Sequence, residues 1–185
     1  MDALNALHDR VSSPRLTEPA PKGDILENIK KAAFRAADHG RMRPWRFLVL
    51  DGLGLIRLGD LLVKSAEANG EVLTDKGRER IVRLPNRAPM IIVAIASPRE
   101  NAKVPEIEQI ISTGAAAQNM INAAYAQGVG TIWRTGDAAY DSIVMKGLGL
   151  SDSERIVGFL YLGTAQGKVP EAPQIEPNEY FQSWF

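Results

Sequence analysis

The sequence predicts an α+β fold in which a central mixed or antiparallel sheet is flanked by helices on both faces. Two apolar runs, Ala88–Ser97 and Ile156–Gly163, have the β-branched, uncharged composition of strands buried on both sides. Segments with helical spacing lie between the strands without a regular βαβ alternation. The 185 residues contain neither an internal repeat nor a linker, so we expect one domain over residues 1–185.

The first half of the chain is expected to contain four helices and one strand. Asp2–Asp9 is predicted as a short helix, and the prolines that follow it favour an extended connection. A helix is expected from Gly23 to about Ala37, because its apolar residues recur at i, i+3 and i+4. Phe47–Leu50 is predicted as a strand that ends at the turn Asp51-Gly52. Further helices are expected over Leu55–Ala68 and Asp75–Arg83, the second of them very polar.

The second half is expected to contain the longest helix, Pro105–Gln127. Its middle, Ser112–Ala117, consists of small residues that let a flat group or another backbone approach closely. Gly128 and Gly130 favour the end of this helix, and Thr131–Arg134 is predicted as a short strand. Asp137–Lys146 is predicted as a helix before the second buried strand.

The tail from about residue 166 is rich in proline and ends in aromatic residues. Tyr180, Phe181, Trp184 and Phe185 all lie in the last six positions. So much aromatic surface near a terminus indicates that the tail docks somewhere. It can dock on its own chain or on a dimer partner, and we expect the dimer partner.

Composition excludes several classes of function. Lys+Arg and Asp+Glu balance at 22 each, so the surface as a whole has no net positive charge that would attract nucleic acid or an anionic membrane. The absence of cysteine excludes a disulfide scaffold, a thiolate metal site and thiol redox chemistry. The longest apolar run is shorter than the roughly 20 residues that a transmembrane helix needs. The N-terminus lacks the apolar core of a signal peptide, so a cytoplasmic location is expected.

The segment Arg35–Arg46, the arginine loop, is the clearest candidate for ligand binding. It places four arginines, His39 and a Pro-Trp pair within twelve residues, between a helix and a strand. The guanidinium group is suited to phosphate because its planar fork donates two parallel hydrogen bonds. Arg10, at the end of the first helix, can serve the same purpose or can complement the helix dipole. The sequence therefore predicts a distributed anion site.

Other kinds of site lack their motifs. No Gly-x-Gly-x-x-Gly follows a strand and opens a helix, and there is no Walker loop or nucleophile elbow. The only two histidines, His8 and His39, lie far apart in sequence without an accompanying acidic cluster, so no metal site is predicted. An electron-transfer function would therefore depend on a borrowed cofactor.

An ordered set of motifs resembles the nitroreductase family of flavin mononucleotide (FMN) enzymes, in particular its short, minimal subgroup. The set contains Arg10-Val11-Ser12 with Arg15, the arginine loop up to Trp45, Asn101–Pro105, GVGTIWRTG at 128–136 and GFLYLGT at 158–164. The sequence departs from the family pattern at Val11, Ala37 and Arg43, where arginine, proline and glutamine are usual.

The resemblance implies a nitroreductase-like fold, bound FMN and a homodimer with the flavin at its interface. It implies that FMN is bound by Arg10, Val11, Ser12, Trp133, Arg134, Thr135 and Lys168, and by Arg35 and His39 of the partner. It further implies that NADH or NADPH meets the end of the long helix at Ala123, Ala124, Tyr125, Ala126, Gln127 and Gly128.

The implied reaction is hydride transfer from NAD(P)H through the flavin to a nitroaromatic, a quinone or a similar small acceptor, by a ping-pong mechanism. The flavin carries the chemistry, so no side chain is predicted as an essential acid or base. Two alternatives stay open at this point: a flavin-binding protein without turnover, which serves storage or sensing, and a family offshoot with other flavin chemistry such as dehydrogenation.

Overall fold

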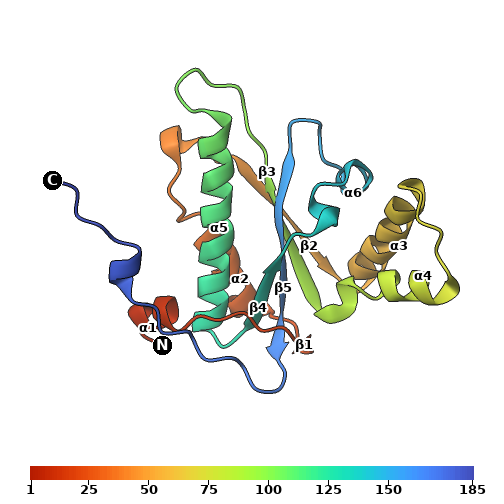
Figure 1. Cartoon of the computed structure of the whole chain (residues 1–185), viewed down its shortest axis with the longest axis horizontal. Coiled ribbons are helices and arrows are strands. Elements are labelled where there is room, and N and C mark those ends of the chain that lie inside the picture. Colours follow the sequence, from red (N-terminus) through yellow and green to blue (C-terminus); the bar gives the residue numbers. More distant parts are fainter.

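Five antiparallel strands form one sheet in the computed structural model, which describes residues 1–185 (Figure 1). The central strands β3 and β5 pair along their length, and β2 forms the outer edge beside β3. On the other side of β5, β4 and the short β1 pair with successive parts of the strand. The strands are β1 Leu16–Thr17, β2 Trp45–Asp51, β3 Met90–Ala96, β4 Gly130–Arg134 and β5 Arg155–Ala165.

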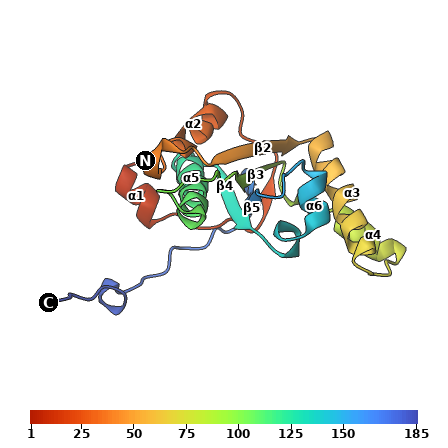
Figure 2. The same ribbon diagram turned by 90° about the horizontal axis from the view of Figure 1, so that it is seen from above.

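Six helices surround this sheet, and four of them pack against its faces, which confirms the predicted α+β fold (Figure 2). Helices α2 and α5 pack against one face, and α3 and α6 pack against the other. Helix α4 packs against α3, and α1 packs against α5. The helices are α1 Ala3–His8, α2 Gly23–Ala33, α3 Leu53–Ala68, α4 Asp75–Val82, α5 Glu106–Ala126 and α6 Ser142–Gly147. No helix is long and apolar enough to cross a membrane.

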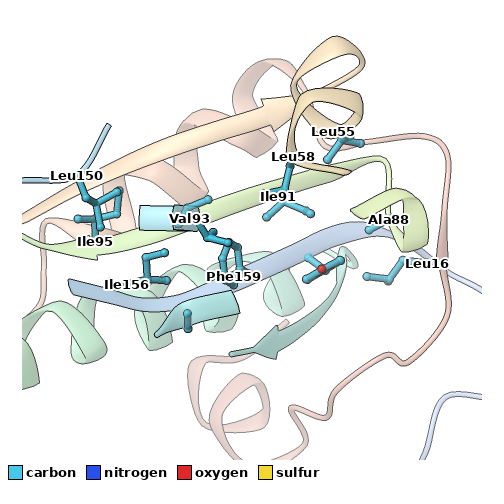
Figure 3. Packing of buried hydrophobic residues seen from close by; sticks show 13 residues of the cluster. Leu16, Leu55, Leu58, Ala88, Ile91, Val93, Ile95, Leu150, Ile156 and Phe159 are labelled. Atoms are coloured by element: carbon cyan, nitrogen blue, oxygen red, sulfur yellow. The ribbon is translucent and has the colours of Figure 1, made fainter. Parts of the chain in front are cut away.

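Strand β3 is buried on both faces, as its uncharged sequence predicts. Its side chains alternate between two hydrophobic clusters, since successive residues of a strand point to opposite faces. Ile91, Val93 and Ile95 join the cluster under α3 and α6, which Figure 3 shows from close by. Met90, Ile92 and Ala94 join the cluster under α2 and α5. The sheet is therefore the middle layer of three.

The small residues in the middle of α5 pack closely against the sheet and against Trp133. Ala116 and Ala117 are fully buried against the sheet. Gly114 faces the indole of Trp133, since a Cβ at this glycine would lie 4.0 Å from Trp133 Cη2. The flat group that the small residues were expected to admit is thus supplied, at least in part, by the chain itself.

Three differences from the expected elements have an identifiable cause, while β2, α3 and β5 only extend one or two residues beyond their expected ends. Helix α2 ends at Ala33 instead of Ala37, because the next residues form tighter i→i−3 turns, with Arg35 N donating to Ala32 O. The helix expected over Asp137–Lys146 begins only at Ser142, since the Asp141 carboxylate accepts from Ile143 N and Val144 N and caps the helix there. Strand β1 lies inside the connection that was expected only to be extended.

The C-terminal tail projects away from the rest of the chain (Figure 2). Its aromatic side chains are largely exposed, with 71% of Tyr180 and 78% of Phe181 accessible to solvent, and Trp184 is fully exposed. A short 3-10 turn, Pro177–Glu179, is the only regular structure after β5. Within one chain, the aromatic surface of the tail therefore remains uncovered.

Candidate functional site

The end of β4 carries three residues that the sequence singles out, and it directs them to different places. The Trp133 indole lies on the α5 side of the sheet, where Nε1 donates to Val157 O at 3.3 Å. Arg134 lies on the opposite side, with its guanidinium carbon 5.8 Å from the centre of the Tyr161 ring. Thr135 is exposed just beyond the strand. The Trp133 side chain is therefore part of the packing, and Arg134 and Thr135 face a cavity.

This cavity, the central pocket, has a volume of about 460 Å³ and lies between the sheet and helices α3 and α4. Leu58, Leu62 and Ile81 supply apolar walls, and Arg134, Thr135 and Tyr161 line the side of the sheet. An apolar cavity with a few convergent polar groups is the usual form of a small-molecule site. The central pocket is thus the best-formed candidate site of the chain.

Arg134 is the polar group of the central pocket that most clearly lacks a partner. Its Nε is the one buried side-chain nitrogen or oxygen atom that has no hydrogen bond. Burial raises the pKa of the nearby Tyr161 phenol, while the positive charges of Arg134 and Arg87 act in the opposite direction. Buried donors are normally satisfied, because leaving one unpaired costs about 1–3 kcal/mol. A bound ligand that accepts hydrogen bonds would relieve this cost.

The N-terminal segment reaches β4 from its outer edge. Ser13 is buried, and its N–H donates to Thr131 O at 2.8 Å, so Arg10, Val11 and Ser12 lie beside the start of β4. The side chain of Arg10 makes no ion pair within the chain. The segment therefore offers a free guanidinium at the open edge of the sheet.

Lys168 lies at the same end of the sheet. It follows β5 by three residues, and the nearby Gln166 N donates to Arg15 O at 3.0 Å. Lys168 is exposed and makes no ion pair. The end of β5 thus brings a second free cation near Arg15, at the end of the N-terminal segment.

The arginine loop has an unusual backbone that one carboxylate holds in place. Arg41 and Arg43 adopt left-handed φ angles of 54° and 48°, which residues other than glycine seldom do. The Asp38 carboxylate accepts from Met42 N at 3.1 Å and from Arg43 N at 2.8 Å. Thr113 donates to Pro44 O at 3.0 Å and ties the loop to α5. A second cavity of about 810 Å³ lies here, lined by Arg35, Arg41, Arg43, Trp45 and Phe47 among others.

The four arginines of this loop are not equivalent. Arg46 donates to both carboxylate oxygens of Glu154, at 2.6 and 2.8 Å, and its charge is neutralised there. The hydrogen bonds from Arg46 lower the pKa of Glu154 from 4.5 to about 2, and they raise the pKa of Arg46. Arg35, Arg41 and Arg43 are exposed and make no ion pair. Only these three are therefore available to a ligand.

Arg35 and His39 lie at the opposite end of α5 from the N-terminal segment. His39 Nδ1 lies 2.6 Å from Glu108 Oε2, in the first turn of α5, and Ser112 donates to Ala37 O one turn later. Arg10–Ser12 lie beside β4, which begins just after the last turn of α5. A helix of 21 residues is about 30 Å long. One chain therefore does not bring the two groups together.

The end of α5, which the resemblance assigns to the nicotinamide nucleotide, is partly occupied by contacts within the chain. Gln127 donates to Ala123 O and Ile25 O, and its Oε1 accepts from Asn28. Ala124 is fully buried, whereas Tyr125 is only half-buried. Ala126 and Gly128 are exposed, and they leave the surface of this turn open.

Sequence reasoning missed the residues on the far side of the central pocket. The sequence predicts Asp75–Arg83 only as a polar helix, whereas in the fold Arg80 lines the pocket, together with Arg87 from the following turn. Tyr161 was included in a buried apolar strand. Two signals in the sequence could have indicated this wall of the pocket. They are the hydroxyl of Tyr161 within an apolar strand and the closely spaced Arg80, Arg83 and Arg87.

Comparison with known proteins identifies the family. Residues 10–164 match the model of the Nitroreductase family. The chain belongs to the nitroreductase family. It is 43% identical over 185 residues, the full length of both chains, to the Escherichia coli K12 protein named "Putative NAD(P)H nitroreductase YdjA".

Solved structures of the family share the fold. A nitroreductase-like family protein from Bacillus cereus has a TM-score of 0.82 at 25% identity, and the match covers 100% of this chain and 96% of that chain. A nitroreductase with bound FMN from Bacteroides fragilis has a TM-score of 0.75 at 18% identity, with both chains fully covered. These likenesses confirm the nitroreductase-like fold expected from the sequence.

Proposed function

We propose that the chain is an FMN-dependent oxidoreductase that takes a hydride from NADH or NADPH and reduces a nitroaromatic, a quinone or a similar small acceptor. The observation that carries this proposal is the central pocket, with the unpartnered Arg134 Nε at its edge. Relatives whose names read "Putative NAD(P)H nitroreductase" and a family structure with bound FMN support it. The two substrates would use the pocket in turn, as in a ping-pong mechanism.

The residues present fit the chemistry of FMN. Its phosphate requires cations without an acidic partner, and Arg10 and Lys168 meet this requirement near the edge of β4. Ser12, two residues after Arg10, would offer a hydroxyl to the sugar-alcohol chain, next to the backbone of Val11. The flavin ring requires hydrogen-bond donors beside an apolar wall, which Arg134, Thr135 and the central pocket provide.

The protein itself would contribute binding, orientation and electrostatics. When bound, FMN supplies the atom that accepts a hydride from the nicotinamide and passes it to the acceptor. Arg134 and Arg87 place positive charge beside the pocket and stabilise negative charge that develops there. Leu58, Leu62 and Ile81 exclude water from one wall. No side chain is assigned as an essential acid or base.

The nicotinamide nucleotide is proposed to bind at the turn that ends α5, over Ala123–Gly128. The left-handed Gly128, with a φ of 76°, and the exposed Ala126 keep this turn free of bulky side chains. Tyr125 offers a half-buried ring at the same place. The contacts of Gln127 with α2 hold the turn in position.

A homodimer would complete the site. Arg35 and His39 lie beside the first turn of α5, whereas Arg10 lies near its last turn. They therefore do not share a flavin with Arg10 of the same chain, and in this proposal they reach the flavin of the partner. Exposed apolar side chains on neighbouring elements offer a surface for the second copy. They are Leu4 and Leu7 on α1, Phe34 after α2, and Ile107 and Ile111 on α5.

The uncovered tail is proposed to dock on the partner subunit as well. Deleting residues 180–185 removes four exposed aromatic side chains, so we expect the dimer to dissociate or to melt at a lower temperature. Sedimentation and thermal unfolding across a range of protein concentrations measure this effect. An unchanged mass together with an unchanged melting temperature would show that the tail is dispensable.

The proposal is tested first by flavin binding. We expect the purified protein to carry a flavin absorbance, or to change the spectrum of added FMN, and to oxidise NADH or NADPH when an acceptor is present. Replacing Arg10 with alanine should weaken FMN binding by about 2–5 kcal/mol if the arginine pairs with the phosphate. A protein that changes neither the FMN spectrum nor its melting temperature with FMN would exclude the proposed function. Flavin binding without reduction by NAD(P)H in stopped-flow mixing would instead favour a binding protein without turnover.

A further inference from the structure

A shallow basic groove lies beside the central pocket, on α4 and the 3-10 turn Pro85–Arg87. It has a volume of about 430 Å³, and six residues line it: Lys76, Glu79, Arg80, Arg83, Leu84 and Arg87. Arg80, Leu84 and Arg87 also line the central pocket. The groove and the pocket are therefore adjacent, and Arg80, Leu84 and Arg87 form their common border.

Three cations of the groove have no acidic partner. Arg83 pairs with Glu79, its neighbour one turn earlier on the helix. Lys76, Arg80 and Arg87 make no ion pair anywhere in the chain. Like charges four residues apart, such as Lys76 and Arg80, destabilise a helix slightly. The groove thus keeps a net positive charge that its own helix does not compensate.

The central pocket carries the opposite charge on another part of its wall. Glu71, Asp137 and Asp141 line it together with the arginines. Burial by itself would raise the pKa of Asp141, but hydrogen bonds from Val144 N, Asn69 and Ile143 N outweigh it and lower the pKa. An anionic ligand group would be repelled from this part of the wall. The favourable place for the group is the basic groove at the mouth.

We infer that the basic groove binds the oxyanion group of a small molecule whose ring enters the central pocket. For turnover, this inference rests on the proposed function. The oxyanion is the carboxylate of an aromatic acceptor or, if NADPH binds here and not at the end of α5, its 2′-phosphate, because both accept the paired hydrogen bonds that a guanidinium donates. Arg87 lies near enough to Tyr161 to act on its charge, so it stands where the groove meets the pocket.

The acceptor arm compares 4-nitrobenzoate with 4-nitrobenzyl alcohol, which share the ring and the nitro group but differ in charge. We expect the wild-type enzyme to favour 4-nitrobenzoate by about tenfold in kcat/KM, the effect of one charge-assisted hydrogen bond. In Arg80→Gln and Arg87→Gln the ratio should fall toward one. The matched control is Arg78→Gln, since Arg78 lies on the same helix, pairs with Glu67 and lines neither cavity.

The donor arm compares NADPH with NADH in the same variants. A preference for NADPH that disappears in Arg80→Gln, with an unchanged acceptor ratio, would identify the 2′-phosphate as the bound group and would support the inference. If neither ratio changes in Arg80→Gln or Arg87→Gln, the inference is overturned.

A binding arm separates this inference from the proposed function. Calorimetry on the purified protein compares benzoate with benzyl alcohol, and adenosine 2′,5′-bisphosphate with AMP. We expect one anionic probe to bind more tightly than its control probe in the wild type and in Arg78→Gln, and to lose that advantage in Arg80→Gln. This result would stand even if turnover failed. If Arg80→Gln weakens FMN binding and leaves the binding of the anionic probes unchanged, the groove belongs to the cofactor and the inference is wrong.

Discussion

The arginine loop and the basic groove are both rich in arginine, yet the fold treats their charges differently. In the loop, Glu154 neutralises Arg46, and Asp38 fixes the backbone that carries Arg41 and Arg43. In the groove, the cations project from one helix and its following turn, and a single exposed pair with Glu79 offsets them. The number of arginines in a segment therefore does not show how many are free to bind a ligand. The carboxylates that the fold brings to them decide it.

The largest expected effect tests the neutralised arginine of the loop. Glu154→Gln leaves Arg46 without its carboxylate, and we expect the free energy of unfolding to fall by about 3 kcal/mol at neutral pH. Glu154 is only 7% exposed, so water replaces the lost contact poorly. Urea denaturation of both proteins measures the difference. A loss below about 0.5 kcal/mol would mean that the pair is no stronger than an exposed one.

The same pair gives a pH dependence with a defined sign. The pKa of Glu154 is about 2 in the folded chain, against an ordinary value of 4.5. Because the folded value is the lower one, the carboxylate contributes its full stability above about pH 4.5 and loses it as the pH falls through about 2. The difference in the free energy of unfolding between wild type and Glu154→Gln should therefore become smaller as the pH falls from about 4.5 to about 2, and acid denaturation of both proteins measures it. A gap that stays constant down to about pH 2 would contradict the lowered pKa.

A smaller effect is expected where the loop backbone is held. Asp38→Ala removes the acceptor for Met42 N and Arg43 N and should cost about 1–2 kcal/mol of stability. The matched control is Asp60→Ala, because Asp60 is an exposed aspartate of α3 whose carboxylate makes no hydrogen bond. Thermal unfolding compares the two variants. Equal melting temperatures would show that the left-handed residues hold their conformation without Asp38.

The smallest effect is expected on the helix of the groove. Arg78→Gln breaks an exposed pair with Glu67 and should change the unfolding free energy by less than about 0.5 kcal/mol. Raising the salt concentration should reduce even this difference, since exposed charges are screened. If Arg78→Gln lost as much unfolding free energy as Glu154→Gln, the ion pairs of the arginine loop and of α4 would contribute equally to stability, contrary to the comparison above.

The sequence alone predicted much of the fold because strands and helices have local periods. The two buried strands, the long α5 and the short β4 were all found where their patterns placed them. The errors arose where a side chain ended a helix, as Asp141 does at α6, or where pairing created a strand, as Ala165 does with Leu16 of β1. Such events depend on hydrogen bonds that periodicity does not reveal.

The candidate site was predictable only in part. The sequence indicates Arg10, Ser12 and Lys168, and the fold places Arg10 and Ser12 beside β4, with Arg10 and Lys168 both free of an acidic partner. The resemblance implies that Trp133 borders the flavin ring, which stays a prediction; in the fold its indole packs on the α5 face of the sheet, away from the central pocket. That distinction depends on the side of the sheet to which a residue points, which the register of β4 with β5 fixes.

The sequence by itself determined the buried strands, the α+β class, the concentration of arginine in one loop and the resemblance to a family of flavin enzymes. Only the tertiary structure decided which charges remain free, because Arg46 and Glu154 are 108 residues apart in sequence and meet through the fold. The tertiary structure also creates the central pocket and the basic groove, since their walls come from α3, α4, β4 and β5. Local patterns specify elements, whereas a cavity exists only between elements that packing has brought together.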